Sequence, residues 1–136
     1  MLTVASSWYL VGLACTVGLV NYPGFSLVDA RSWPDFHRHH ARRISWAVGP
    51  AWAAQAIGLV AWLLADHGVT QVDWCLCAAG AGAAVALTVL VAVPHHHHLG
   101  ERFESARVAA LRRAHAWRTL CWAIAAVAAT LRWVSL

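Results

Sequence analysis

The histidines of this chain gather near the ends of apolar segments. His37, His39 and His40 precede one such segment, and the run 95–98 follows another within "VAVPHHHHLG". Neutral imidazoles are ligands for zinc, copper and iron, and imidazoles also accept and release protons near neutral pH. These residue types therefore predict a metal site or a site of proton transfer.

The spacing of the histidines selects three of them. His37 and His40 are three residues apart, so they share one face of a helix. A short interfacial helix is predicted around them, because Ser32 can cap it and Asp35 stands in its first turn. With His96 from the second segment, these imidazoles would form a three-nitrogen site for copper.

Other ligand sets remain open at this stage. His39, His97 and His98 are second choices as ligands, and Glu101 with Glu104 would supply oxygen atoms to iron. Iron or zinc could replace copper, and a site without any metal is the remaining alternative.

Arg118 is the most informative of the other polar residues. An arginine one turn inside an apolar segment costs a few kcal/mol unless it reaches the interface, is paired, or faces a wet cavity. In a cavity it would hold an anionic substrate or an oxygenated intermediate. Tyr22, Arg43 and His115 stand at the same level of the chain and complete the predicted catalytic set.

Composition indicates how these residues are positioned. The 136-residue chain is 60% hydrophobic, with a mean hydropathy of +0.56, which is well above the roughly 45–50% of a soluble domain. We expect an all-α, integral-membrane four-helix bundle forming a single domain over 1–136, with a short interfacial helix in its first cytoplasmic loop. Its expected spans are 4–20, 44–65, 74–93 and 116–133, each long enough to cross a bilayer.

Arginine placement predicts the orientation of the spans. The connections 21–43 and 94–115 carry four arginines each, whereas 66–73 carries none. By the positive-inside rule the histidine-rich loops are cytoplasmic and both termini lie outside, in a multi-pass protein of the inner (plasma) membrane. The net charge of +4 is located mainly in these loops, where it sets the orientation, so no nucleic-acid partner is expected. The lipid bilayer is an expected partner, and a homo-oligomer is a further alternative.

Small and cyclic residues predict how the spans pack. The segment "CAAGAGAAVAL" would let neighbouring backbones approach closely, and Gly49-Pro50 should kink the second span. Cys75 and Cys77 are poor disulfide partners on one helix and are expected to be free thiols, with a soft-metal pair as the alternative.

Several segments also resemble known families. "NYPGFSLV", "FHRHHARRISWAVGP", "VPHHHHL" and "RRAHAWRTLCW" resemble a family of small, uncharacterised bacterial four-span membrane proteins. The P-x-H-x-x-L element and the W-R-T element also resemble anthrone oxygenase-like membrane proteins. The resemblance implies an oxygenase acting on a flat, electron-rich aromatic, with His96 and Arg118 as matching positions.

In the smaller family the resemblance extends to Asn21, Tyr22, His37, His40 and Arg43. In the members of that family, Asn commonly occupies the position of His115. The broader family often has Asn in place of His96, and its enzymes have been considered to work without a metal.

Three functions follow from these patterns. The first is a metal-dependent oxidoreductase or oxygenase, with copper favoured over iron, acting on a small hydrophobic and aromatic substrate. The second is a metal-independent, anthrone-type oxygenase that uses a histidine base and an arginine. The third is a non-catalytic metal-binding or structural membrane subunit.

Overall fold

The computed structural model describes residues 1–65 and 71–134, which are almost entirely helical. No strand occurs within these ranges, so the all-α prediction is confirmed. The elements in chain order are α1 (Leu2–Thr16), η1 (Val17–Asn21), α2 (Tyr22–Gly24), η2 (Phe25–Leu27), α3 (Trp33–Ala65), α4 (Gln71–Leu87), η3 (Thr88–Ala92), α5 (Val93–Glu101) and α6 (Ser105–Val134).

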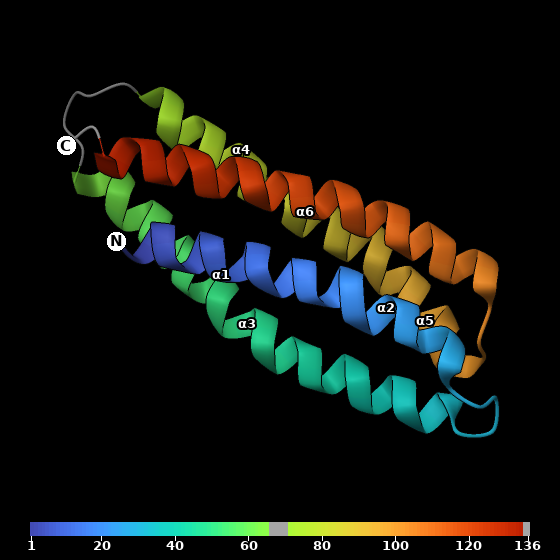
Figure 1. Cartoon of the computed structure of the whole chain (residues 1–136). Coiled ribbons are helices and arrows are strands. Elements are labelled where there is room, and N and C mark those ends of the chain that lie inside the picture. Colours follow the sequence, from blue (N-terminus) through green and yellow to red (C-terminus); the bar gives the residue numbers. More distant parts are fainter. Residues whose placement is uncertain (66–70, 135–136) are drawn as a thin grey trace.

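The long helices lie side by side in one elongated bundle (Figure 1). Helix α1 lies between α3 and α6, and α6 also packs along α4, whereas α3 and α4 share much less contact. The start of α1, the end of α3, the start of α4 and the end of α6 lie at one end of the bundle. The connections η2–α3 and α5–α6 lie at the other end, which therefore carries both arginine-rich segments.

Three helical stretches are long and apolar enough to cross a membrane: Leu2–Leu27, Trp33–Ala65 and Val72–Glu101. They contain the first three expected spans and extend well beyond them. The fourth expected span, 116–133, lies in α6, which is of spanning length but is not among these apolar stretches. Arg118 and Arg132 lower the hydropathy of that segment, so a membrane arrangement of four spans stays a prediction.

The separate interfacial helix expected in the first loop is wrong. Helix α3 begins at Trp33, directly after the expected cap Ser32, but it runs on without interruption to Ala65. Pro50 lies inside this helix. The basic segment "FHRHHARR" thus extends the second apolar span, and His37 and His40 are fixed rigidly to it.

Glycines allow the closest approaches between helices, as the small-residue pattern predicts. A Cβ atom on Gly80 of α4 would lie 2.7 Å from the Cys121 carbonyl oxygen and 3.1 Å from the Ala125 backbone nitrogen of α6. A Cβ atom on Gly58 of α3 would meet Thr3 of α1 in the same way. Both sets of contacts include backbone atoms, with the Thr3 hydroxyl as the nearest atom at Gly58, so they limit how closely the helix axes can approach.

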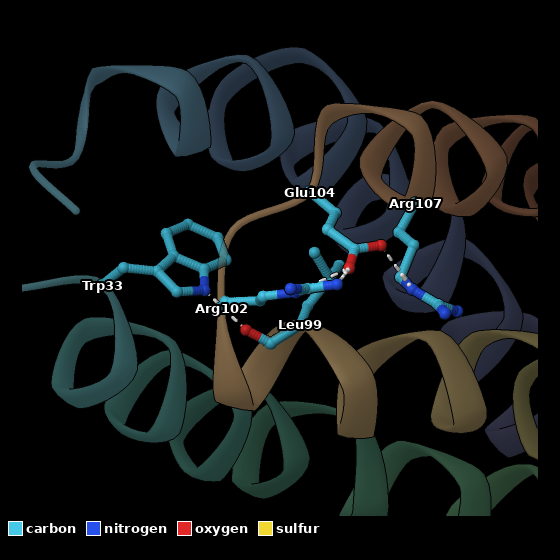
Figure 2. Close-up of polar contacts among 5 residues, drawn as sticks. All are labelled: Trp33, Leu99, Arg102, Glu104 and Arg107. Carbon is cyan, nitrogen blue, oxygen red and sulfur yellow. Dashed lines mark hydrogen bonds and ion pairs between the residues drawn. The ribbon is translucent and has the colours of Figure 1, made fainter.

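The arginine-rich end is closed by a second, aromatic core. Trp33, Phe25, Leu99 and Leu111 are all fully buried there. The indole Nε1 of Trp33 donates a hydrogen bond to the Leu99 carbonyl oxygen, which ties α3 to α5 (Figure 2). This core holds α5 against α3, and so it positions the histidines that the two helices carry.

A small ion-pair network fixes the connection from α5 to α6. Glu104 accepts hydrogen bonds from Arg102 at 2.8 Å and from Arg107 at 2.7 Å (Figure 2). These hydrogen bonds favour the carboxylate, and they hold the pKa of Glu104 below its ordinary value of 4.5. Glu104 is thereby occupied with arginines and is not directed at the histidines.

Polar contacts also occur between the apolar stretches. The Gln55 side chain on α3 donates a hydrogen bond to the Ser7 hydroxyl on α1 at 2.8 Å, and both residues are buried.

All four cysteines are free, with Cys75 exposed and Cys77 buried. Cys75 and Cys77 form no disulfide with each other, and the two thiols occupy different environments on α4.

Candidate functional site

A cavity of about 660 Å³ opens among the helices near the arginine-rich end. Residues from α1, η1, α2, α3, η3, α5 and α6 line it. Its volume falls within the roughly 300–1,000 Å³ of typical small-molecule sites. Most of its wall is apolar, from Leu10, Leu13, Ile44, Val48, Trp52, Val89 and Trp122.

The cavity brings together the three histidines that were predicted as ligands. His37, His40 and His96 all line it. The Nε2 atom of His37 lies 3.1 Å from the Nδ1 atom of His96, although the two residues are 59 positions apart. Thus the predicted convergence of imidazoles from separate segments is confirmed for this group.

Aromatic rings hold these imidazoles in place. The His40 ring stacks on Phe36 and meets Phe25 edge-on at a centroid distance of 5.1 Å. His37 packs against Trp33 at 5.3 Å and is itself buried. The histidine cluster therefore rests on the aromatic core that closes this end of the bundle.

His115 is buried beside the cavity and makes two hydrogen bonds. Arg118 donates from Nη2 to the His115 Nδ1 atom at 2.7 Å, because a guanidinium can only donate. On its other side the His115 Nε2 atom lies 2.8 Å from the Ala14 carbonyl oxygen, which can only accept. His115 is therefore the neutral tautomer with its proton on Nε2, and neither ring nitrogen is free for a metal or for a substrate proton.

Arg118 lines the cavity and is held by neutral groups. Besides His115, its Nη1 atom donates to the Thr88 hydroxyl at 3.3 Å, and its guanidinium lies close to the Tyr22 side chain. The ion pairs found within 1–65 and 71–134 do not include Arg118. The positive charge thus faces the cavity without a carboxylate to neutralise it.

The whole cavity shares this excess of positive charge. Its polar lining includes two arginines (Arg38 and Arg118) and four histidines (His37, His40, His96 and His97), and no aspartate or glutamate of the described chain lines it. Arg38 pairs with Asp35 at the exposed surface. Because Arg118 lacks such a pair, it is the cationic group best placed to bind an anion.

Irregular helix turns occur at the level of Arg118. The π-helical segments η1 and η3 interrupt the helices that contact His115 and Arg118. The Thr88 hydroxyl at the start of η3 donates to the Ala84 carbonyl oxygen at 2.8 Å and accepts from Arg118. At Gly18 in η1 an added Cβ atom would lie 3.0 Å from the His115 Nε2 atom, so a glycine there allows the imidazole to approach. Single π-helical turns are frequent at functional sites.

The other predicted residues are distributed unevenly. Tyr22 is buried and lines the cavity, and His97 lines it from an exposed position. Arg43, His39 and His98 are exposed and do not line it. His67 lies outside the described residues.

Sequence reasoning missed Thr88 and the apolar wall. Thr88 interrupts an otherwise apolar segment, and this isolated hydroxyl was the signal that could have identified it as a partner for a buried polar group. Trp52 and Trp122 looked like ordinary span residues, because nothing in the sequence distinguishes a cavity-lining tryptophan from a lipid-facing one.

The fit to a metal is partial. Within the described ranges no group of three or more His, Cys, Asp or Glu side chains is arranged to hold a metal ion.

Comparison of the chain with protein-family models, with curated proteins and with solved structures found no match. The resemblance to anthrone oxygenase-like proteins therefore stays a prediction, and the site must be interpreted from its own chemistry.

Proposed function

We propose that this chain is a membrane-embedded, metal-independent oxygenase that binds a small, largely apolar aromatic molecule as its oxyanion. The observation that carries the proposal is Arg118, a cation held only by neutral partners on the wall of a cavity that no carboxylate lines. A half-buried guanidinium of this kind stabilises an anion, because the mostly apolar wall around it lowers the local dielectric constant.

The substrate rings would pack against the apolar wall, with an acidic oxygen directed at Arg118. His115 and Thr88 keep the guanidinium in place by filling two of its hydrogen-bonding directions. His115 is thus a positioning residue for Arg118, and Tyr22 is available to donate a further hydrogen bond to the oxyanion.

The His37–His96 pair supplies the base. When His96 donates its Nδ1 proton to His37 Nε2, its own Nε2 atom is bare and can accept a proton from the substrate. The resulting imidazolium keeps its Nδ1–H bond to the neutral His37, which stabilises the charge. Anthrone illustrates the balance: its CH₂ group loses a proton to His96, and Arg118 holds the enolate. The carbanion combines with dioxygen to give a peroxide anion, His96 returns the proton to it, and loss of water from the hydroperoxide leaves a carbonyl.

The membrane setting belongs to the same proposal. Both arginine-rich connections lie at the cavity end of the bundle, which the positive-inside rule would place in the cytoplasm. Four spans in the inner membrane, with α6 as the fourth, would put the cavity near the cytoplasmic interface. The α1, α4 and α6 contacts would then shield Arg118 from lipid.

Oxygen uptake tests this function. Purified protein in detergent or nanodiscs is given anthrone and oxygen consumption is followed, before and after exhaustive chelation. We expect uptake above the protein-free rate, unchanged by chelator and lost in Arg118→Gln and His96→Ala. Arg112→Gln is the matched control, because Arg112 is an exposed arginine of the same helix that does not line the cavity. Uptake that survives in both site variants would refute the proposal.

One observation favours the metal-dependent oxidoreductase as a second candidate. The 3.1 Å between His37 Nε2 and His96 Nδ1 is close to the roughly 3.3 Å between two nitrogens bound to one tetrahedral metal. His40 lines the same cavity and would be the third ligand, for copper first and for iron or zinc otherwise. Such a metal would supply Lewis-acid or redox chemistry at these imidazoles.

Elemental analysis separates the two candidates. A stoichiometric metal that disappears in His37→Ala and His96→Ala, together with activity that chelation abolishes, would favour the metal-dependent enzyme. Bound metal without any turnover would favour the non-catalytic metal-binding subunit.

A further inference from the structure

The cavity has an opening on the side of the bundle. Ser45 and Gly49 of α3 line it from one side, and Val89 of η3 and Val93 of α5 line it from the other. All four are also exposed, with exposed fractions of 52% for Val89 and 41% for Val93. Since these exposed residues line the cavity from both sides and α3 and α4 share little contact, the geometry points to an opening between these helices.

In the proposed membrane arrangement this opening would lie between the cytoplasmic ends of two spans, within reach of acyl chains. Its residues belong to two of the stretches that are apolar enough to span a membrane, Trp33–Ala65 and Val72–Glu101. Leu90, the neighbour of Val89, is 73% exposed and does not line the cavity. An apolar opening flanked by exposed apolar side chains is suited to hydrocarbon and not to water.

Gly49 keeps the opening wide. A Cβ atom added at this position would meet no heavy atom within 4 Å, so the space beside it is empty. Gly82 on α4 also has open space and is exposed, but it does not line the cavity. The two glycines therefore differ mainly in whether a new side chain would enter the opening.

We infer that the aromatic substrate is a membrane-resident amphiphile, whose acidic aromatic head carries an apolar tail. This inference rests on the proposed function. The anionic oxygen of the substrate would bind Arg118, and its tail would extend from the cavity between α3 and η3 into the bilayer. Charge and polarity match along this path: the cationic group lies inside, the wall is apolar, and the opening faces lipid. A compact, water-soluble anion would use only the inner part of this space.

Photolabelling tests the path. Full-length protein in phosphatidylcholine nanodiscs is exposed to a palmitic acid that carries a diazirine in mid-chain, and labelled peptides are mapped by mass spectrometry. We expect labelling at Ser45–Gly49 and Val89–Val93, competed by unlabelled palmitate and weak with the methyl ester, which lacks the charge. Gly49→Trp should lose most of this labelling and Gly82→Trp should retain it.

A second pair of variants guards against misfolding. Val89→Trp should block the opening as Gly49→Trp does, whereas Leu90→Trp should not. Labelling unaffected by both blocking variants, or equal for the acid and the ester, would overturn the inference. The outcomes remain separable from the proposed function: charge-dependent labelling without anthrone oxidation would refute the oxygenase alone. Anthrone oxidation without labelling at the opening would refute the lipid path alone.

Discussion

Replacing Arg118 by glutamine removes the charge on which anion binding depends and leaves the fold in place. Glutamine is a strong helix former and retains N–H donors for its neighbours. Because the arginine has no carboxylate partner among the described ion pairs, its removal leaves no orphaned counter-charge. We therefore expect Arg118→Gln to fold and to unfold at a temperature equal to or above that of the wild type.

The size of the binding loss follows from the site. A hydrogen bond to a charged group contributes about 1.5–3 kcal/mol, which corresponds to a roughly 10- to 150-fold rise in Kd. The cavity that Arg118 lines is mostly apolar, so the loss should fall in the upper half of that range. Arg118→Lys should give a smaller loss, because it keeps the charge. Some loss is still expected, because the single lysine nitrogen replaces the two guanidinium nitrogens that bind Thr88 and His115.

Two fluorescent ligands of the same shape make the assay specific. The 9-anthracenecarboxylate anion should bind the wild type and lose affinity by this factor in Arg118→Gln, measured in nanodiscs. Its neutral analogue 9-anthracenemethanol should bind both proteins about equally, because only packing against the apolar wall holds it. An equal loss for both ligands, or no loss for the anion, would refute the assignment of Arg118 as the anion-binding group.

Three further predictions concern helix packing, the tautomer of His115 and the ion pairs of Glu104. Gly80→Ala should lower the free energy of unfolding by about 1–3 kcal/mol, since its methyl group would meet α6 backbone atoms, whereas Gly82→Ala, with open space, should not; thermal unfolding in detergent compares them, and equal midpoints would contradict the packing. Gly18→Ala should displace His115, whose Nε2 atom would lie 3.0 Å from the new carbon, and histidine NMR should then show loss of the single Nε2–H tautomer; an unchanged spectrum would contradict the contact. Because the pKa of Glu104 is depressed, its contribution to the stability of the α5–α6 connection is complete above the ordinary value of 4.5 and is lost as the pH falls through the lower folded value. Protection of the amides of 102–107 from exchange should therefore be lost only at acidic pH, whereas in Glu104→Gln it should be low at every pH.

Apolar composition predicted the helical class and three stretches that are long and apolar enough to cross a membrane, because burial in lipid imposes a minimum length of apolar chain. The same reasoning placed the helix boundaries too narrowly. Hydropathy measures the preference for lipid and not the preference for helix, so it separated "FHRHHARR" from the span that follows, although one helix covers both. In α6 the sequence predicted a fourth span, but Arg118 and Arg132 lower the hydropathy of this helix, so its crossing of the membrane stays a prediction.

The candidate site was partly predictable. Histidines at 37, 40 and 96 were expected to converge, and they do, because the connections that carry them lie at one end of the bundle. The hydrogen bond between His115 and the Ala14 carbonyl oxygen on α1 could not be predicted, because a sequence does not show which backbone atom a distant side chain will meet. The spacing of three residues between His115 and Arg118 was visible, and that spacing alone indicated a pair on one helix face.

The most direct test is an experimental structure of the protein in lipid nanodiscs with 9-anthracenecarboxylate bound. The account predicts the carboxylate within about 3 Å of the Arg118 guanidinium, the rings against Trp52 and Trp122, and His37 beside His96 next to the ligand. An anion bound elsewhere, with Arg118 extended to the membrane interface and the cavity closed, would contradict it.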